Sequence, residues 1–215
     1  MWRSHRVLTV GKSPVQVESA LREGVLACPG CGGELRPWGH GVRRVIRTLA
    51  CGVRLVLRPR RSRCRGCGVT HVLLPAHLLA RRADEVAVIG RALGRAAAGE
   101  GYRRIAVAVG RSCWTVRSWV RRARGRAERL RSALAAWIVA LDPDPPPLVA
   151  SPTAWGEAVV VIAAVHRAAV ARWPWLVGRV SAWEVAVAAT DGSLLAPVLA
   201  VRVINTNLPL VTFGN

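Results

Sequence analysis

One stretch of the sequence decides the fold of the N-terminal part: CPGCGGELRPWGHGVRRVIRTLACGVRLVLRPRRSRCRGCG, residues 28–68. It opens with Cys28-Pro29-Gly30-Cys31 and closes with Cys64-Arg65-Gly66-Cys67, two Cys-x-x-Cys pairs separated by 32 residues and each followed by glycine. Glycine lets the backbone turn tightly behind each pair and direct amide N–H groups towards the sulfurs. Four thiolates complete a tetrahedral structural zinc site and leave no open position for catalysis. We therefore predict one structural Zn²⁺, with Cys28, Cys31, Cys64 and Cys67 as its ligands.

Other uses of the cysteines and histidines are less favoured. Disulfides are the alternative for the two pairs, but a reducing cytoplasm disfavours them. His40 or His71 could replace a sulfur, although the four cysteines already complete the set. Cys51 and Cys113 have no Cys-x-x-Cys partner, and we expect each to be a small buried side chain.

The residues between the cysteine pairs predict a β-hairpin. Val53, Leu55 and Leu57 recur with the two-residue period of a strand, and residues 42–49 give the opposing strand, with a turn at 50–52. A hairpin whose ends are clamped by a metal is a zinc ribbon. Upstream, residues 6–10 predict a short strand, and residues 13–16 open a helix that runs to Glu23 and ends at Gly24.

Positive charge is concentrated in the first two thirds of the chain. The 215 residues include 32 Lys+Arg and 12 Asp+Glu, a net charge of +20. Residues 1–140 hold 28 of the basic and 7 of the acidic residues, whereas residues 141–215 hold 4 and 5. Such an excess repels itself unless a polyanion or an acidic partner neutralises it. The balance therefore indicates a polyanion partner for residues 1–140 only.

The segment between Glu34 and Asp84 contains no acidic residue. Arginine forms bidentate pairs with phosphate oxygens, so a basic hairpin is suited to phosphate contact. The plainer alternative is a solvated surface in an arginine-rich composition. We predict phosphate contacts for four arginines of the hairpin: Arg54, Arg58, Arg60 and Arg61.

Residues 84–124 predict three helices, the last two joined by a tight turn. The first, over residues 84–98, has one apolar face and is ended by Gly99 and Gly101. The second covers residues 103–109, and Ser112 is the N-cap of the third. Ala106, Gly110 and Val116 stand where two crossing helices need a small contact, a tight turn and an apolar lock. This pattern resembles the DNA-binding helix-turn-helix, whose second helix enters the major groove.

The outward face of this motif is expected to contact double-stranded DNA. Arg117 and Arg121 suit guanine N7 and O6 or phosphate. Trp114 could contact a thymine methyl group or fill a gap in the core, and a helical hairpin that merely packs is the alternative for the whole motif. The predicted contacts are Arg103, Arg104, Ser112, Trp114, Thr115, Arg117, Ser118, Arg121 and Arg122.

The chain after residue 125 predicts helices but no chemistry. An apolar stripe at helical spacing extends to Leu141, and the proline-dense residues 143–147 cannot continue a helix. We expect one helix from Ser151-Pro152 to Arg172, a second from a capping box at residues 181–184 towards Ala189, and a strand at 194–204. No catalytic motif is present, and His166 has no evident partner. Four tryptophans are expected in the core: Trp155, Trp173, Trp175 and Trp183.

Together these patterns predict an α+β protein in four parts. They are a zinc-ribbon domain at residues 1–75, a helix-turn-helix domain at 76–140, a proline-rich linker at 141–152 and a mixed C-terminal segment of unknown role at 153–215. The sequence contains no run of about 18 apolar residues, so we expect no membrane-spanning helix, and no secretory signal is visible. We expect a cytoplasmic, nucleoid-associated protein.

A ribbon opened by Cys-Pro-x-Cys-Gly, closed by Arg-Cys-x-x-Cys-Gly and followed by a helix-turn-helix resembles a known module. It is similar to the N-terminal DNA-binding part of bacterial insertion-sequence transposases, and to small helix-turn-helix proteins derived from them, over about residues 25–125. The resemblance implies recognition of an element's terminal repeats. In that family a ribonuclease-H-like domain with three metal-binding carboxylates cuts and joins the strands. Here about 75 residues with few acids follow residue 140, too few for such a domain.

We therefore expect a non-enzymatic, zinc-stabilised, sequence-specific DNA-binding protein of transposase or regulator type. A homodimer, or a separate chain that carries the transposase nuclease domain, would be its protein partner. The alternative from another class is a zinc ribbon that binds single-stranded RNA. Only Trp38 lies near the ribbon as a stacking platform for bases, which disfavours that alternative.

Overall fold

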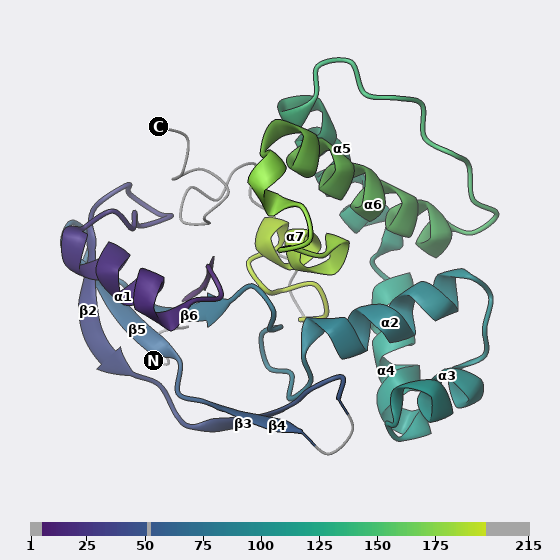
Figure 1. Cartoon of the computed structure of the whole chain (residues 1–215), viewed down its shortest axis with the longest axis horizontal. Coiled ribbons are helices and arrows are strands. Elements are labelled where there is room, and N and C mark those ends of the chain that lie inside the picture. Colours follow the sequence, from purple (N-terminus) through teal and green to yellow (C-terminus); the bar gives the residue numbers. More distant parts are fainter. Residues whose placement is uncertain (1–5, 51–52, 197–215) are drawn as a thin grey trace.

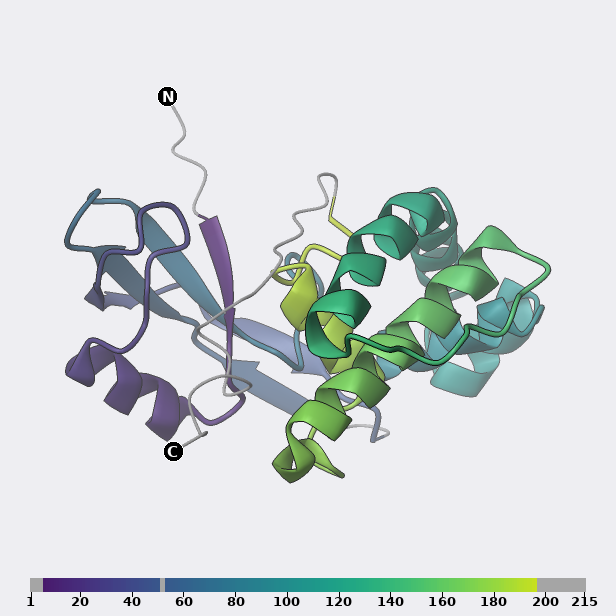
Figure 2. The same ribbon diagram turned by 90° about the horizontal axis from the view of Figure 1, so that it is seen from above.

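A computed structural model of the chain, which describes residues 6–50 and 53–196, confirms the α+β class. A sheet with one helix forms the N-terminal part, and a group of helices lies beside it (Figure 1; Figure 2, from above). A β-hairpin projects from the sheet towards the helices. The predicted metal ligands lie in the sheet part, and the arginine-rich helices within residues 102–124 lie in the helical part.

The N-terminal sheet has four strands in the order β1-β6-β5-β2. These are β1 (Arg6–Val10), β6 (Thr70–Pro75), β5 (Arg60–Cys64) and β2 (Leu35–His40); β1 and β6 run parallel and the other pairs antiparallel. Helix α1 (Pro14–Glu23) begins with Ser13 accepting the Gln16 N–H and ends at Gly24, whose φ of 74° is left-handed. The predicted first strand and first helix are therefore confirmed.

Helix α1 packs against the sheet because one of its faces is apolar. Leu21 is fully buried there, beside the half-buried Val17 and Ala20. The described part of this core holds eight buried side chains: Leu8, Val10, Leu21, Leu26, Cys28, Leu35, Cys64 and Leu73. Two of the eight are predicted metal ligands, so the core and the cysteine cluster are continuous.

The predicted hairpin is present as β3 (Arg44–Arg47) and β4 (Arg54–Leu57), which pair antiparallel with Arg47 opposite Arg54. It continues the β2–β5 pair, so residues 35–64 form one long hairpin with a break near Gly41, whose N–H donates to the carbonyl of Pro59. Strands β2 and β5 were not predicted, because LRPWGH and RRSRC show no apolar alternation. Residues 51 and 52 of the predicted turn lie outside the described part.

The helical part contains α2 (Val86–Ala97), α3 (Tyr102–Val109), α4 (Cys113–Arg124), α5 (Ala127–Leu141), α6 (Ala154–Arg172), a 3₁₀ turn η1 (Pro174–Leu176) and α7 (Ala182–Ala189). One cluster of 31 buried side chains, counted over the described residues, draws on all six α-helices. Helices α5 and α6 pack along each other although the exposed proline-rich linker separates them in sequence (Figure 1). The four-part division of the chain stays a prediction, but the helices on both sides of the linker share one core.

Several local predictions for the C-terminal part can be compared with the structure. The helix expected from Ser151-Pro152 begins later, at Ala154, and is capped by Thr153, whose hydroxyl accepts the Gly156 N–H. The capping box of α7 is present as predicted. Residues 194–196 form a turn instead of the start of a strand, and residues 197–204 lie outside the described part. His166 does have a partner, because its Nε2 lies 2.8 Å from the carbonyl oxygen of Val180. Of the four tryptophans, Trp155 is buried and the other three are half-buried.

The expectation that Cys113 is buried is wrong. Cys113 is the first residue of α4, where the helix emerges into solvent, and its side chain is exposed. Trp114 beside it is exposed as well, and the buried face of α4 begins only at Val116. Cys51, the other cysteine expected to be buried, lies outside the described part.

Helix α6 has the length and apolar composition of a membrane-spanning helix. Half of its most apolar 18-residue window is buried inside the protein, and the helix packs against α5 and α7. The core helix of a globular protein has the same composition, so this feature alone is weak evidence for a membrane span.

A tight contact between α2 and α7 yields a stability prediction. A Cβ atom built at Gly90 would lie 2.4 Å from the Trp183 ring, which stacks on the buried Trp155 ring with centroids 6.4 Å apart. Trp155 is itself held by donating Nε1–H to the Leu93 carbonyl. We expect Gly90→Ala to lower the free energy of unfolding by about 1–3 kcal/mol, the usual cost of overpacking.

Gly94 provides the matched control for this prediction. It lies one helical turn further along α2, where an added Cβ would meet the Trp183 ring only at 3.9 Å, an ordinary contact. Gly94→Ala should stabilise the protein by about 0.5–1 kcal/mol through helix propensity. Denaturant unfolding of both variants tests the pair, and equal effects at the two positions would contradict it.

Candidate metal centre and nucleic-acid interface

The four predicted metal ligands lie together at one end of the sheet. The sulfur atoms of Cys28, Cys31, Cys64 and Cys67 are all within 4.8 Å of one another. The Cys28–Cys67 sulfur distance is 3.8 Å and the Cys31–Cys64 distance is 3.4 Å. Four sulfurs around one ion at ~2.3 Å would be separated by about 3.8 Å, so the cluster has the size of a tetrahedral metal site. The chain thus has a site that could bind a metal ion.

Two similar turns bring the sulfurs together. In the first turn the Gly32 N–H donates to the Cys28 carbonyl, and in the second the Gly68 N–H donates to the Cys64 carbonyl. Both glycines have left-handed φ angles, 70° and 67°, which an L-residue rarely adopts. A Cβ atom at Gly33 would lie 3.0 Å from the Cys64 sulfur, so the backbone there approaches the cluster closely.

The thiols of the cluster limit one another's ionisation. The Gly33 N–H favours the Cys31 thiolate, but hydrogen bonds with the neighbouring thiols raise its pKa from 9.0 to about 12. Burial opposes ionisation of Cys64, but the Cys67 N–H and the adjacent thiols lower its pKa to about 7. One sulfur therefore ionises at the expense of another. Four thiolates in so small a volume require a cation to balance their charge.

His71 lies next to the cluster without belonging to it. Its ring is fully buried, and its Nε2 is 3.5 Å from the Cys28 sulfur. A ring N–H in this position can donate to a metal-bound thiolate and orient it, as neighbours of metal ligands commonly do. His40, the other candidate replacement ligand, is exposed on β2 and lies outside the cluster.

Helices α3 and α4 are joined by a three-residue turn at the predicted position. Gly110 has φ 62°, and Ser112 caps α4 by accepting the Thr115 N–H. Ala106 is buried at the crossing, and Val116 is fully buried below it. The predicted inward face of α4 is therefore confirmed, and its opposite face is open to solvent.

The residues predicted to contact DNA on this pair of helices lie on the outer surface. Arg103, Arg104, Ser112, Trp114, Arg117 and Arg121 are exposed, and Thr115, Ser118 and Arg122 are half-buried. Trp114 is 72% exposed, which rules out the alternative that it fills a gap in the core. The Arg117 guanidinium lies near two rings, 5.8 Å from the Tyr102 centroid and 5.6 Å from that of Trp114. Tyr102 was not singled out from the sequence.

The four hairpin arginines do not form one surface. Arg54 and Arg58 are exposed, whereas Arg61 on β5 is half-buried. The Arg60 guanidinium makes two hydrogen bonds to the Glu18 carboxylate, at 2.8 and 3.1 Å, and lowers the pKa of Glu18. Arg60 is thus engaged with α1, and Arg54, at the other end of the hairpin, lies near the α3–α4 turn.

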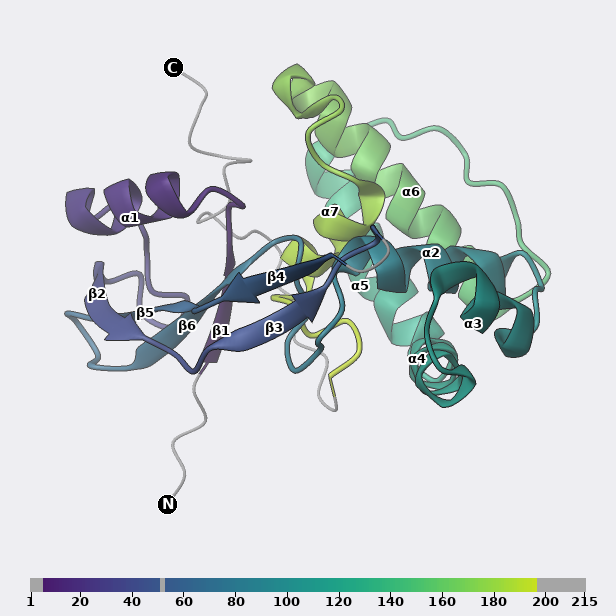
Figure 3. The same cartoon turned by 60° about the horizontal axis from the view of Figure 1, so that its bottom comes forward.

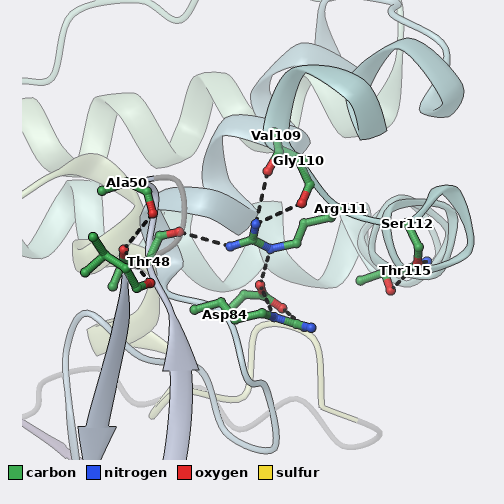
Figure 4. Close-up of polar contacts among 10 residues, drawn as sticks. Thr48, Ala50, Asp84, Val109, Gly110, Arg111, Ser112 and Thr115 are labelled. Carbon is green, nitrogen blue, oxygen red and sulfur yellow. Dashed lines mark hydrogen bonds and ion pairs between the residues drawn. The ribbon is translucent and has the colours of Figure 1, made fainter.

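The sequence patterns missed an ion cluster that connects the hairpin to the helices (Figure 4). Asp84, 3% exposed at its side chain, accepts two hydrogen bonds from Arg47 of β3 and one of 2.6 Å from Arg111 of the α3–α4 turn. Arg111 also donates to the carbonyls of Gly110 and Thr48. The one available signal was that Asp84 is the first carboxylate after 49 residues without one.

One comparison with known proteins finds a likeness. A family model described as a domain of unknown function (DUF6431) matches residues 28–108. The match begins at the first cysteine of the cluster, includes all four, and ends one residue before the end of α3. No curated protein and no solved structure matches the chain. The likeness therefore spans the cysteine cluster, the hairpin, α2 and most of α3, and leaves α4 outside.

Proposed function

We propose that this chain is a zinc-stabilised, sequence-specific, double-stranded DNA-binding protein of transposase or regulator type, without a catalytic domain of its own. The observation that carries the proposal is the exposed face of α4, which presents Trp114, Arg117 and Arg121. The second helix of a helix-turn-helix reads base edges in the major groove with such a face. Arginine is the residue that most often pairs with guanine N7 and O6.

The charge around this face supports a polyanion partner. Residues 101–127 contain eight arginines and no carboxylate. The Arg117 guanidinium lies 5.8 and 5.6 Å from the Tyr102 and Trp114 ring centroids, and such cation–π contacts restrict where it points. A pre-oriented arginine loses less conformational entropy when it binds a base.

Zinc is the ion that suits the cysteine cluster best. Four sulfurs at tetrahedral spacing select a soft cation, and Zn²⁺ is the usual structural ion of Cys₄ sites. With four protein ligands the ion would have no free position for water or substrate. Its role would be to join the Cys28–Cys31 turn before β2 to the Cys64–Cys67 turn between β5 and β6.

The resemblance to insertion-sequence transposases supports duplex DNA as the partner. It leaves two ways in which the DNA-bound chain could act. The chain acts alone or as a homodimer, as a regulator does, or it recruits a separate subunit that carries the nuclease carboxylates. An RNA-binding ribbon is the competing function. Among the described residues of the ribbon, Trp38 alone offers that function a platform; it is half-exposed, with Arg63 stacked 4.8 Å over its ring.

Selection of bound sequences from a random duplex pool tests the proposal. We expect the full-length protein to enrich a defined sequence and to bind it with a log–log salt slope near −5, the value for about six neutralised phosphates. Arg117→Ala should relax the preference at one base pair, by about 1–3 kcal/mol of discrimination. Arg58→Ala should instead weaken all sequences alike.

The control for these variants is Arg172→Ala, at the exposed end of α6. It should leave both affinity and sequence preference unchanged. Salt-independent binding, or tighter binding to single-stranded RNA than to the selected duplex, would contradict the proposal.

A further inference from the structure

A groove of about 440 Å³ lies between the end of the β3–β4 hairpin and α3. Arg47 and Arg54 of the hairpin form one wall, and Arg91 of α2 with Arg111 of the α3–α4 turn form the other. The exposed Val107 side chain of α3 also lines the groove and adds an apolar surface. None of the exposed α4 residues named above lines this groove, so it is separate from the base-reading face.

The groove carries an excess of positive charge. Four arginines line it, and Asp84 behind the lining pairs with two of them, which leaves an excess of three positive charges. Asp84 engages Arg47 and Arg111, while Arg54 and Arg91 are exposed and form no ion pair with a described carboxylate. Two uncompensated guanidinium groups on opposite walls are suited to hold anionic oxygens between them.

Contacts between the hairpin and the helical part fix the shape of the groove. Besides the Asp84 ion pairs, the Arg47 N–H donates to the Ala83 carbonyl and the Glu85 N–H donates to the Arg47 carbonyl. The hairpin is therefore joined to the start of α2 by backbone as well as by side chains. Figure 3 shows β3, β4, α3 and α4 on the same side of the molecule. A rod-like ligand on α4 would continue past the α3–α4 turn towards the hairpin.

We propose that this groove, called here the hairpin groove, binds the sugar–phosphate backbone of duplex DNA beside the sequence that α4 reads. The inference rests on the proposed function. Arg54 and Arg91 would hold phosphate oxygens, and Val107 would lie against a deoxyribose. Arg47, Asp84 and Arg111 would fix the distance between the two contacts. The bound duplex would thus be covered on one flank beyond the recognised bases.

The test compares the full-length wild type with the double variant Arg54→Ala/Arg91→Ala on the selected duplex. We expect the variant to keep the selected sequence but bind about tenfold more weakly at ~0.1 M salt, with a salt slope less steep by about two. Hydroxyl-radical footprinting should show protection extending past one end of the recognised sequence in the wild type, and lost there in the variant. The control is Arg167→Ala/Arg172→Ala, which removes two exposed arginines from α6 and should change none of these quantities.

The outcomes separate the two proposals. Wild type that binds no duplex would remove the proposed function and this inference with it. Wild type that binds a defined sequence, with a double variant of equal affinity, slope and footprint, would overturn the inference alone. A variant that selects a different sequence would also overturn it, because Arg54 or Arg91 would then read bases and not phosphates.

Discussion

Removing the metal from the full-length protein is expected to unfold the N-terminal sheet and leave the helical part folded. Over the described residues, the apolar core between α1 and the sheet holds eight buried side chains, including two predicted ligands, whereas the helical core holds 31. Structural zinc binds with about 10–16 kcal/mol in small metal-dependent domains. That exceeds what a core of this size can supply, since whole domains are stable by only about 5–15 kcal/mol.

Limited proteolysis after chelation measures this effect. Cleavage should concentrate within residues 6–75, while a fragment containing α2 to α7 resists and the helical circular dichroism persists. Metal analysis of untreated protein should give one zinc per chain, and Cys28→Ser should lose it. Cys113→Ser is the matched control, because Cys113 is exposed on α4 and lies outside the cluster. Chelated protein with an unchanged N-terminal protection pattern would contradict the prediction.

The cysteine cluster could be predicted from the sequence because its four members come in two local pairs. Each Cys-x-x-Cys-Gly turn is built by hydrogen bonds within a few residues, so spacing alone determines it. The α3–α4 pair was predictable for the same reason: Gly110 and Ser112 define the turn and the cap locally. Strands β2 and β5 were missed because their pairing depends on partners and not on a pattern within either strand.

The Asp84 cluster and the hairpin groove could not be derived from the sequence for a different reason. Arg47, Asp84 and Arg111 are far apart in the chain, and the chain has more than thirty basic residues that could pair with a given carboxylate. The packing of the hairpin against the helices is what makes Arg47 and Arg111 the partners of Asp84. The expectation that Cys113 is buried failed for a related reason. Whether a residue at the start of a helix faces the core or solvent depends on how that helix packs, and Cys113 faces solvent.

Asp84→Ala is expected to destabilise the protein strongly for a single change of a polar side chain. The carboxylate is almost fully buried and balances Arg111, whose side chain is only 16% exposed, so its removal leaves an uncompensated buried charge. Breaking a buried ion pair from one side costs about 3–5 kcal/mol. Arg47 is nearly half exposed and can be solvated, which places the expected loss near the lower limit, about 3 kcal/mol.

Two comparisons identify the origin of this loss. Glu128→Gln removes a carboxylate from an exposed pair with Arg131 within α5, and such surface pairs contribute little, so its unfolding midpoint should not move. The double variant Asp84→Ala/Arg111→Ala should recover part of the loss, because neither charge then remains unpaired. Amide hydrogen exchange at Arg47 and Glu85 should speed up in Asp84→Ala, since these N–H groups join the hairpin to α2. If Asp84→Ala unfolds at the same denaturant concentration as Glu128→Gln, the ion cluster does not hold the hairpin against the helices. The hairpin groove would then owe its shape to the backbone hydrogen bonds alone.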